Sequence, residues 1–409
     1  MKKILTTILT ATLALSACVS NTSTTTANPA PVVTETKLPD TGQSHVYDVD
    51  GNEVEVTDES SPYYGADATV EGNALSYHDN GDGTVTDLNT GLTWQQTPDF
   101  SRMSFDEAKE YCENLTLGGY DDWRLPTIKE LYSLAQFDGE IIPRGESTPY
   151  IDTDYFDFKY DHLVFAGQYF SSTVYVKEGV QNYDEHGSIQ AVFGFNFADG
   201  HIKGYETGYW FDGTKITQAD GVMLPGCYVR AVRGETNLYD MEYVDNGDGT
   251  VTDNSTGLMW AQDDSGDRMD WIEALAYANE SELGGYSDWR LPNSKELQSL
   301  VDYEGSDFPA INTDFFNMTQ TTFESEEDRA YFWTSTTQGD FKHTACYVSF
   351  AQAWSKKNSS ATTYYDWHGA GAQRSDPKTG DPADYELASE MASDYISIDN
   401  YVRLVRDAE

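Results

Sequence analysis

The chain of 409 residues is poor in basic side chains, and this deficit limits its partners. It has 25 Lys and Arg residues against 69 Asp and Glu residues, a formal net charge of −44 at pH 7. A field of this sign repels nucleic acids, anionic lipid surfaces and sulfated polysaccharides, and it favours cations, neutral sugars or basic partners. We therefore expect no nucleic-acid partner. The charge also has a simpler interpretation, since a high net charge keeps a protein soluble.

Long apolar runs are also missing, so no segment after the N-terminus is expected to cross a membrane. The first residues are different: two lysines precede an apolar segment over residues 4–15, and Leu-Ser-Ala then leads to Cys18. Small residues before a cysteine are typical of a lipoprotein signal peptidase site, which predicts removal of residues 1–17 and lipidation of Cys18. The alternative is an ordinary secretory signal in which Cys18 has no role. Because residue 19 is Val rather than Asp, we expect a lipid anchor in the outer membrane, with the cell surface favoured over the periplasmic face.

Large apolar side chains are scarce in the next part of the chain. Residues 18–37 are rich in Thr, Ser, Asn and Pro, and such a composition cannot bury enough surface to fold alone. We interpret them as a flexible tether that makes the only contact with the membrane, through its lipid. Residues 38–76 are acidic and rich in glycine. We interpret them as an N-terminal extension of uncertain order.

What the chain does contain is an internal repeat. Residues 77–134 align without a gap to residues 243–300, at an offset of 166, and 34 of the 58 positions are identical. The later halves match more loosely, but both end in a Tyr-Val-Arg-x-Val-Arg strand. The repeat predicts two related units over residues 77–235 and 242–407.

The same local signals recur in order within each unit. The block Asp-Asn-Gly-Asp-Gly-Thr-Val-Thr-Asp is followed by Thr-Gly-Leu-x-Trp, which predicts a hairpin. A segment with apolar residues at helical spacing begins at Phe105, and a capping box from Thr127 to Glu130 opens a second helix. Short strands come after it. We expect an α+β fold in which each unit has two helices and an antiparallel sheet.

These blocks, with Gly-Gly-Tyr-x-Asp-Trp-Arg-Leu-Pro between the two helices and the terminal Tyr-Val-Arg-x-Val-Arg strand, closely resemble the C-terminal domain of the Legionella collagen-like protein. The resemblance covers nearly all of residues 77–407 and implies two tandem C-type-lectin-like domains, related in architecture to the sulfatase-modifying factor. It also implies surface exposure and ligand binding, with adhesion to glycosaminoglycan-like polysaccharide in the namesake. The chain departs from the namesake in lacking a Gly-X-Y stretch and in being strongly acidic.

The lectin-like resemblance also implies a disulfide. In such folds the first helix packs beside the terminal strand, and a bond between them is common, so we expect Cys112 to pair with Cys227 and Cys346 to stay free. An exported location permits oxidation. The second unit has Ala278 and Asn400 at the equivalent positions. Both cysteines are thus missing together, as a bonded pair requires.

Six repeated aspartates are the candidate metal ligands. Calcium needs several oxygen ligands from a tightly curved loop, and the Asp-Asn-Gly-Asp-Gly run supplies carboxylates and glycines. The spacing lacks the EF-hand register, and Asn-Gly and Asp-Gly are also strong turn dipeptides, so calcium and a plain turn stay open alternatives. The candidate ligands are Asp79, Asp82, Asp87, Asp245, Asp248 and Asp253.

Aromatic loops are the candidate ligand-binding residues. The calcium-dependent sugar motifs of C-type lectins, Glu-Pro-Asn or Gln-Pro-Asp followed by Trp-Asn-Asp, are absent, so a sugar would have to be bound by other groups. Exposed aromatic rings stack on sugars or anchor protein partners; the alternative is that these rings pack on their own unit. The candidates are Tyr205, Tyr209, Trp210 and Phe211 in the first unit, and Tyr364, Tyr365, Trp367 and His368 in the second.

Catalysis finds little support in the sequence. The seven histidines do not recur between the units, nor do they form metal-ligand spacings, and the paired cysteines of sulfatase-modifying enzymes are missing. We expect the repeated arginines to pair with acidic neighbours: Arg124 with Asp122 or Glu130, and the strand arginines with carboxylates near them. The resulting hypothesis is a surface lipoprotein that binds a carbohydrate or another cell-surface ligand and is not an enzyme. The alternative is a structural or assembly factor that binds a basic protein at the outer membrane.

Overall fold

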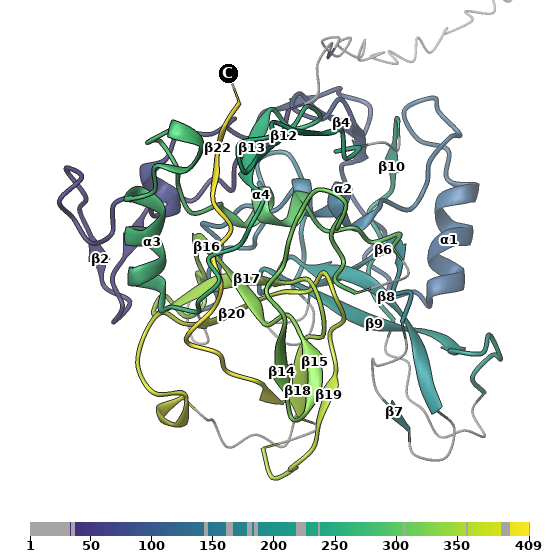
Figure 1. The fold of residues 1–409 in the computed structure, drawn as a ribbon. Helices are drawn as coiled ribbons and strands as arrows, with labels where there is room; N and C mark the ends of the chain where they lie inside the picture. Colours follow the sequence, from purple (N-terminus) through teal and green to yellow (C-terminus); the bar gives the residue numbers. More distant parts are fainter. Residues whose placement is uncertain are drawn as a thin grey trace, which may run out of the picture.

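The computed structural model describes residues 33, 37–142, 146–160, 167–177, 182–183, 187–217, 226–235, 238–305, 308–356, 359–385 and 393–408. Over these residues the fold is mostly antiparallel β-sheet with four α-helices (Figure 1). No helix in these ranges has the length and apolar character needed to cross a membrane. The signal segment and Cys18 lie outside the described residues. The helices are α1 (Phe105–Asn114), α2 (Ile128–Ser133), α3 (Trp271–Asn279) and α4 (Ser294–Ser299).

Each unit begins with a small four-stranded antiparallel sheet. The predicted hairpin forms its centre, with Val85 opposite Trp94 in the first unit and Val251 opposite Trp260 in the second. The last strand of the unit returns to pair with this hairpin. The terminal strand is shorter than expected, since in the first unit only Val232–Arg233 are regular strand. The strands are β3 (Tyr77–Asp79), β4 (Thr84–Asp87), β5 (Thr93–Gln95) and β10 (Val232–Arg233), and β11 (Tyr243–Asp245), β12 (Thr250–Asp253), β13 (Leu258–Ala261) and β22 (Val405–Asp407).

The helices begin where the sequence predicts. A capping box opens each of them: the side chain of the N-cap residue accepts from a backbone N–H three residues later, and the glutamate there accepts from the N-cap N–H. In α1 the residues Phe105, Ala108 and Cys112 are buried, at the spacing of one helix face. The α2 helix is short and ends at Ser133.

The main sheet belongs to both units. Its order is β16-β17-β20-β9-β8-β6, with β7 paired to β8. The two halves meet where Gln373 of β20 pairs with Ile202 of β9. We expected one antiparallel sheet in each unit, and the sheet instead continues across the junction. Its strands are β6 (Gln168–Val174), β7 (Asn182–Tyr183), β8 (Gly187–Asn196), β9 (His201–Trp210), β16 (Tyr331–Thr337), β17 (Thr344–Ser349) and β20 (Gln373–Pro377).

The two units are related by an approximate two-fold axis at this junction. In the sheet order β6, β8 and β9 mirror β16, β17 and β20. The α2 and α4 helices contact one another on the same axis, while α1 and α3 lie on opposite flanks (Figure 1). Equivalent bonds support this relation: Ser172 N–H donates to the Pro126 carbonyl at 2.7 Å, and Ser335 N–H donates to the Pro292 carbonyl at 2.8 Å. The chain therefore folds as an internal dimer of its two units.

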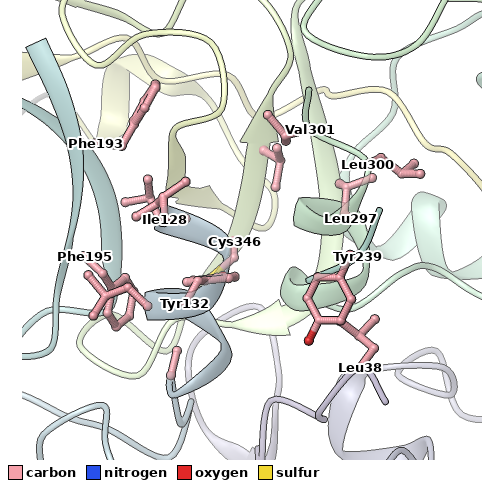
Figure 2. Close-up of a cluster of buried hydrophobic side chains, with 14 of the residues drawn as sticks. Leu38, Ile128, Tyr132, Phe193, Phe195, Tyr239, Leu297, Leu300, Val301 and Cys346 are labelled. Carbon is pink, nitrogen blue, oxygen red and sulfur yellow. The ribbon is translucent and has the colours of Figure 1, made fainter. Parts of the chain in front are cut away.

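One hydrophobic core is shared between the units. It contains Phe193 and Tyr132 of the first unit and Leu297 of the second (Figure 2). Tyr239, from the connection between the units, and Leu38, from the N-terminal extension, belong to the same cluster. The connection is thus packed into the core rather than being a free linker.

The N-terminal extension is ordered over its described residues from 37 onward. Its two short strands form a hairpin, and a bridge joins Pro39 to Asn73. Its buried residues include Thr41 and Asp67. The sequence did not predict this order, because the extension is held by contacts with distant parts of the chain. Its elements are β1 (Val46–Tyr47), β2 (Glu53–Val54) and a 3-10 helix, η1 (Asp67–Thr69).

The second unit carries further short elements, most of them after α4. A hairpin lies beside a three-stranded sheet of order β19-β18-β21. They bring several aromatic rings together. These elements are β14 (Thr321–Phe323), β15 (Glu326–Asp328), β18 (Trp354–Lys356), β19 (Tyr364–Asp366) and β21 (Ser393–Asp394), with the 3-10 helices η3 (Leu283–Gly285) and η4 (Pro382–Asp384).

Candidate functional site

Two pairs of repeated arginines do what the sequence predicts. Arg124 binds both carboxylate oxygens of Glu130 at 2.7 and 2.6 Å, and Arg290 binds Glu296 in the same way at 2.6 and 2.7 Å. Arg233 pairs with Asp122, and its counterpart Arg406 pairs with Asp288. Bidentate pairs of this kind fix geometry. These arginine side chains therefore form ion pairs that stabilise the fold.

Arg230 and Arg403 differ from expectation. We expected acidic partners, but both side chains are fully buried and donate to backbone carbonyls. Arg230 binds the carbonyls of Gln95, Gln96 and Asp157 at 2.7 Å. Arg403 binds three equivalent carbonyls in the second unit. Backbone carbonyls beyond the end of a strand lack a partner in the sheet and need hydrogen-bond donors. A guanidinium group supplies several N–H donors in one plane.

The six candidate metal ligands lie in turns or at the ends of the strands beside them. Asp79 accepts from the Gly81 N–H at 2.8 Å, and Asp82 accepts from the Thr84 hydroxyl at 2.6 Å. Asp87 is buried, which raises its pKa, and it accepts from the Thr90 hydroxyl at 2.7 Å. The second unit repeats this pattern, and among the described residues no group of three or more acidic, His or Cys side chains could hold a metal ion. The geometry favours the turn interpretation. The other three aspartates are Asp245, Asp248 and Asp253.

The aromatic candidates of the first unit are held by their own unit. Trp210 is buried with Ile189 and Ile216. The Tyr209 hydroxyl donates to Asp106 of α1 at 2.5 Å. Tyr205 is half-buried and Phe211 is half-buried, so none of the four is an exposed ring. The structure therefore favours the alternative here, in which the rings pack on their own unit, as Tyr209 and Trp210 do.

The aromatic candidates of the second unit differ in burial. His368 is buried and lies 2.9 Å from Asp394, and burial lowers its pKa. Tyr365 and Trp367 are half-buried. Tyr364 joins Phe323 and Tyr395 in a half-buried aromatic platform, with ring centroids 4.6 to 5.7 Å apart. Sequence reasoning missed Phe323, the last residue of β14, and Tyr395, which follows β21, since no local motif connects them to Tyr364.

The cysteines differ from the expected pairing. Cys112, Cys227 and Cys346 are all free and buried thiols. Cys112 and Cys227 do belong to one cluster, in which they pack among apolar side chains. Burial raises the pKa of Cys112 to about 12 and raises that of Cys227 further. Such thiols behave as small hydrophobic side chains. The expected bond is not formed in this structure.

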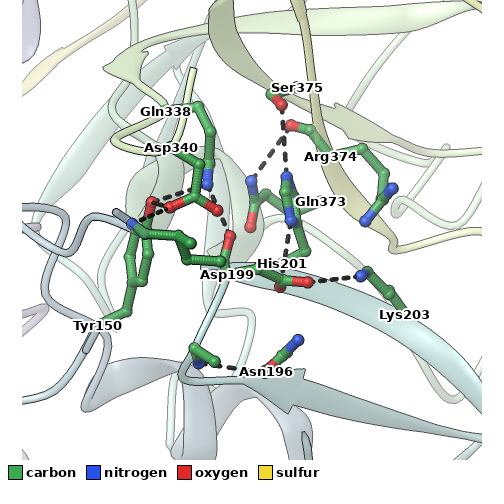
Figure 3. A network of polar contacts seen from close by, with 12 residues as sticks. Tyr150, Asn196, Asp199, His201, Lys203, Gln338, Asp340, Gln373, Arg374 and Ser375 are labelled. Atoms are coloured by element: carbon green, nitrogen blue, oxygen red, sulfur yellow. Dashed lines mark hydrogen bonds and ion pairs between the residues drawn. The ribbon is translucent and has the colours of Figure 1, made fainter. Parts of the chain in front are cut away.

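A polar network crosses the junction between the units (Figure 3). The Gln338 amide donates to the Tyr150 hydroxyl at 2.9 Å and to the Asp199 carbonyl at 2.6 Å. Burial raises the pKa of Asp340 to about 7. Burial also lowers the pKa of His201 to about 4, so this side chain is neutral near pH 7. The network links residues of both units.

A groove of about 530 Å³ opens between the units. Its walls come from the start of α2, the end of β6, the connection and the segment that follows α4. Clefts between domains are common ligand sites. Two other surface hollows, of about 750 and 550 Å³, are each lined by one part of the chain only, the extension and the α1 region. The groove is lined by residues 127–129, 172–174, 176, 238–241 and 301–304.

The groove combines apolar walls with carboxylates. Val176 is 42% exposed within it, and Asp240 and Glu304 are exposed. Asp302 lies in the same wall. Lys129 is half-buried and donates to the Ser299 carbonyl at 2.8 Å; burial lowers its pKa to about 8. The site therefore suits a ligand with apolar surface and cationic or hydroxyl groups. Neither the sequence repeat nor any local motif marks it, because it exists only where the units meet.

The family model of the Lcl C-terminal domain matches residues 83–212 and 249–368, one segment in each unit. These segments together cover more than half of the chain. The chain matches no curated protein and no solved structure.

Proposed function

Because the chain belongs to the Lcl C-terminal domain family, we propose that it is a lipid-anchored protein of the outer membrane that binds a ligand at the cell surface and is not an enzyme. We also propose that each unit is C-type-lectin-like. The two helices per unit and the terminal strand that returns to the first hairpin are compatible with that fold. Carbohydrate is the ligand class that the family resemblance suggests.

The groove between the units carries this proposal. It is built by both copies of the repeat, and it offers an apolar wall beside polar groups, the combination that small binding sites use for affinity and orientation. The repeated arginines and aspartates have partners within the fold, which gives these side chains a structural role.

A neutral carbohydrate fits the charge better than a sulfated one. The net charge of −44 repels sulfate groups. The aromatic platform of Phe323, Tyr364 and Tyr395 offers rings that stack on sugar faces. It is a second place where a sugar would bind.

Binding of a basic protein partner is the second candidate function. The observation in its favour is the set of carboxylates in the groove, Asp240, Asp302 and Glu304. Charge complementarity of this kind steers association and selects partners.

A glycan and polysaccharide screen tests the proposal. Val176→Trp fills the groove, and Val244→Trp is its control, because Val244 is 46% exposed and lies on β11 outside the groove. We expect neutral glycan binding that Val176→Trp abolishes and Val244→Trp keeps. Tyr364→Ala separates binding at the platform from binding in the groove. Lack of glycan binding by the wild-type chain would contradict carbohydrate as the ligand.

The lipid anchor has its own test. We expect that Cys18→Ser prevents acylation and releases the protein from membranes, as metabolic labelling with a fatty-acid analogue would measure. Equal labelling of the variant and the wild type would refute the anchor.

A further inference from the structure

The first residues of the N-terminal extension lie at the junction and contact both units. The Lys295 ammonium donates to the Asp40 carbonyl at 2.8 Å, and the Phe137 N–H donates to the Thr41 carbonyl at 2.9 Å. These bonds hold the backbone of the segment rather than any particular side chain. Residues 38–44 are thus bound much as a peptide is bound by a partner protein.

The next residues of the segment add side-chain contacts. The Gln43 amide donates to the Thr337 carbonyl at 2.8 Å, and its oxygen accepts from the Thr337 N–H at 2.9 Å. Ser44 donates to both oxygens of Asp138, from its N–H at 2.8 Å and from its hydroxyl at 2.7 Å. Gln43 is buried. The segment therefore has a defined register.

The open groove is the two-fold counterpart of this occupied site. At the repeat offset of 166, Lys295 corresponds to Lys129, Phe137 to Tyr303 and Asp138 to Glu304. Thr337 corresponds to Val174, since β16 and β6 are equivalent edge strands. The counterparts Lys129, Tyr303, Glu304 and Val174 all line the groove.

Equivalent local bonds show that the two sites share their framework. The Ile128 N–H donates to the Thr173 hydroxyl at 2.9 Å, and the Ser294 N–H donates to the Thr336 hydroxyl at 2.9 Å. Beside this framework one site holds a segment of the chain and the other is a groove of about 530 Å³.

The groove differs from the occupied site in charge and polarity. Asp302 stands where the occupied site has Gln136, and Val174 stands where it has Thr337. Asp240 adds a third carboxylate to Asp302 and Glu304. An occupant of the groove must therefore match acidic groups and apolar walls, which favours basic and apolar side chains.

We propose that the groove binds a polypeptide segment of a partner protein, with a lysine or arginine facing Glu304. This deepens the second candidate function and rests on it. The backbone of the bound segment follows the path of residues 38–44 at the position related by the two-fold axis. Its basic side chain occupies the position that corresponds to Ser44.

The probes are three fluorescein-labelled octapeptides with the sequence of residues 38–45. One keeps Ser at the position of Ser44, and the other two carry Lys or Glu there. Binding to the full chain with Cys18→Ser is measured by fluorescence polarisation at low salt. We expect the Lys peptide to bind at least about five-fold more tightly than the Glu peptide, as an ion pair replaces a repulsion. Glu304→Lys should reverse the order of the Lys and Glu peptides. Glu282→Lys is the control, since Glu282 is exposed and lies outside the groove.

Several outcomes would overturn the proposal. They are an absence of saturable binding by any of the peptides, equal affinities for all three, or an order that Glu304→Lys leaves unchanged. A Ser peptide that binds as tightly as the Lys peptide would instead indicate the extension of a second copy. Displacement of the Lys peptide by a neutral polysaccharide would assign the groove to carbohydrate. Glycan binding that persists without any peptide binding would leave the proposed function standing and remove this inference alone.

Discussion

Lys129 and Lys295 occupy equivalent positions in α2 and α4, and each donates to the end of the other helix. Lys129 binds the Ser299 carbonyl at 2.8 Å, and Lys295 binds the Ser133 carbonyl at 2.9 Å. Carbonyls at the end of a helix lack partners within the helix and carry partial negative charge. The two lysines therefore cross-link the units on their symmetry axis. Lys295 donates in addition to Asp40 of the extension.

The lysines predict unequal effects on stability. Lys295→Met removes the donor of two carbonyls and Lys129→Met that of one, and each buried carbonyl left without its donor costs about 1–3 kcal/mol. We expect both variants to lower the free energy of unfolding, Lys295→Met more. Urea denaturation measures this, with Lys159→Met as the control at an exposed lysine. Losses no larger than that of the control would contradict the role of these bonds.

Asp67 predicts a pH dependence of stability. Its carboxylate is buried and accepts from the hydroxyls of Thr41 and Thr336. Burial, with the nearby charge of Asp40, raises its pKa to about 7, against about 3.9 in an unfolded chain. The folded state binds the proton more tightly, so the contribution of Asp67 is fully present below about pH 4 and is lost as the pH rises through about 7.

Asp67→Asn should therefore flatten the stability profile between pH 4 and 7. We expect the decline over this range to shrink by roughly 2–4 kcal/mol in the variant. The nearby charged groups are Asp40, Glu296 and Lys295, and burial lowers the pKa of Lys295 to about 7. Lys295 contributes mainly above this window, because its pKa falls from 10.5 to about 7 on folding. Urea denaturation at each pH is the measurement, with Asp121→Asn as an exposed control. Parallel profiles for Asp67→Asn and the wild type would contradict the raised pKa.

Local signals predicted the hairpins and the helix starts, because turn dipeptides and capping boxes act between residues a few positions apart. The capping box of Thr127 and Glu130 is an example. The repeat likewise predicted two units. The way that the units face one another was not predictable, since it depends on contacts such as Gln373 with Ile202, and the order of the extension depends on contacts such as Gln43 with Thr337. The groove exists only because the units face one another in this way and the extension covers the equivalent site, so no motif of one unit could identify it.

The shared core predicts that the two units unfold together. Phe193 of the first unit packs against Tyr303 of the second, with ring centroids 4.9 Å apart. Phe193→Ala should lower the free energy of unfolding by about 3–5 kcal/mol. We expect one calorimetric transition in the wild type, and a single transition at lower temperature in the variant. Two separate transitions, of which only one moves, would show that the units are independent.

The buried thiols predict a definite titration. Cys112, Cys227 and Cys346 are free in the structure and each is at most 3% exposed. Burial raises their pKa values, so little reactive thiolate exists at neutral pH. In the full chain with Cys18→Ser, a thiol-specific reagent should therefore react slowly with the native protein. After unfolding in guanidinium without reductant it should react with all three.

The alternative leaves a different count. If the oxidising compartment joins Cys112 to Cys227, as lectin-like folds suggest, only Cys346 reacts after unfolding, and reduction restores the other two. Peptide mapping without reduction identifies the bonded pair. Cys112→Ala separates the two states further. Where all three thiols are free in the parent chain, the variant lowers the count of reactive thiols from three to two. Where the bond had formed, the variant raises the count from one to two. A wild-type count of one would show that the free thiols of this structure become a disulfide in the exported protein.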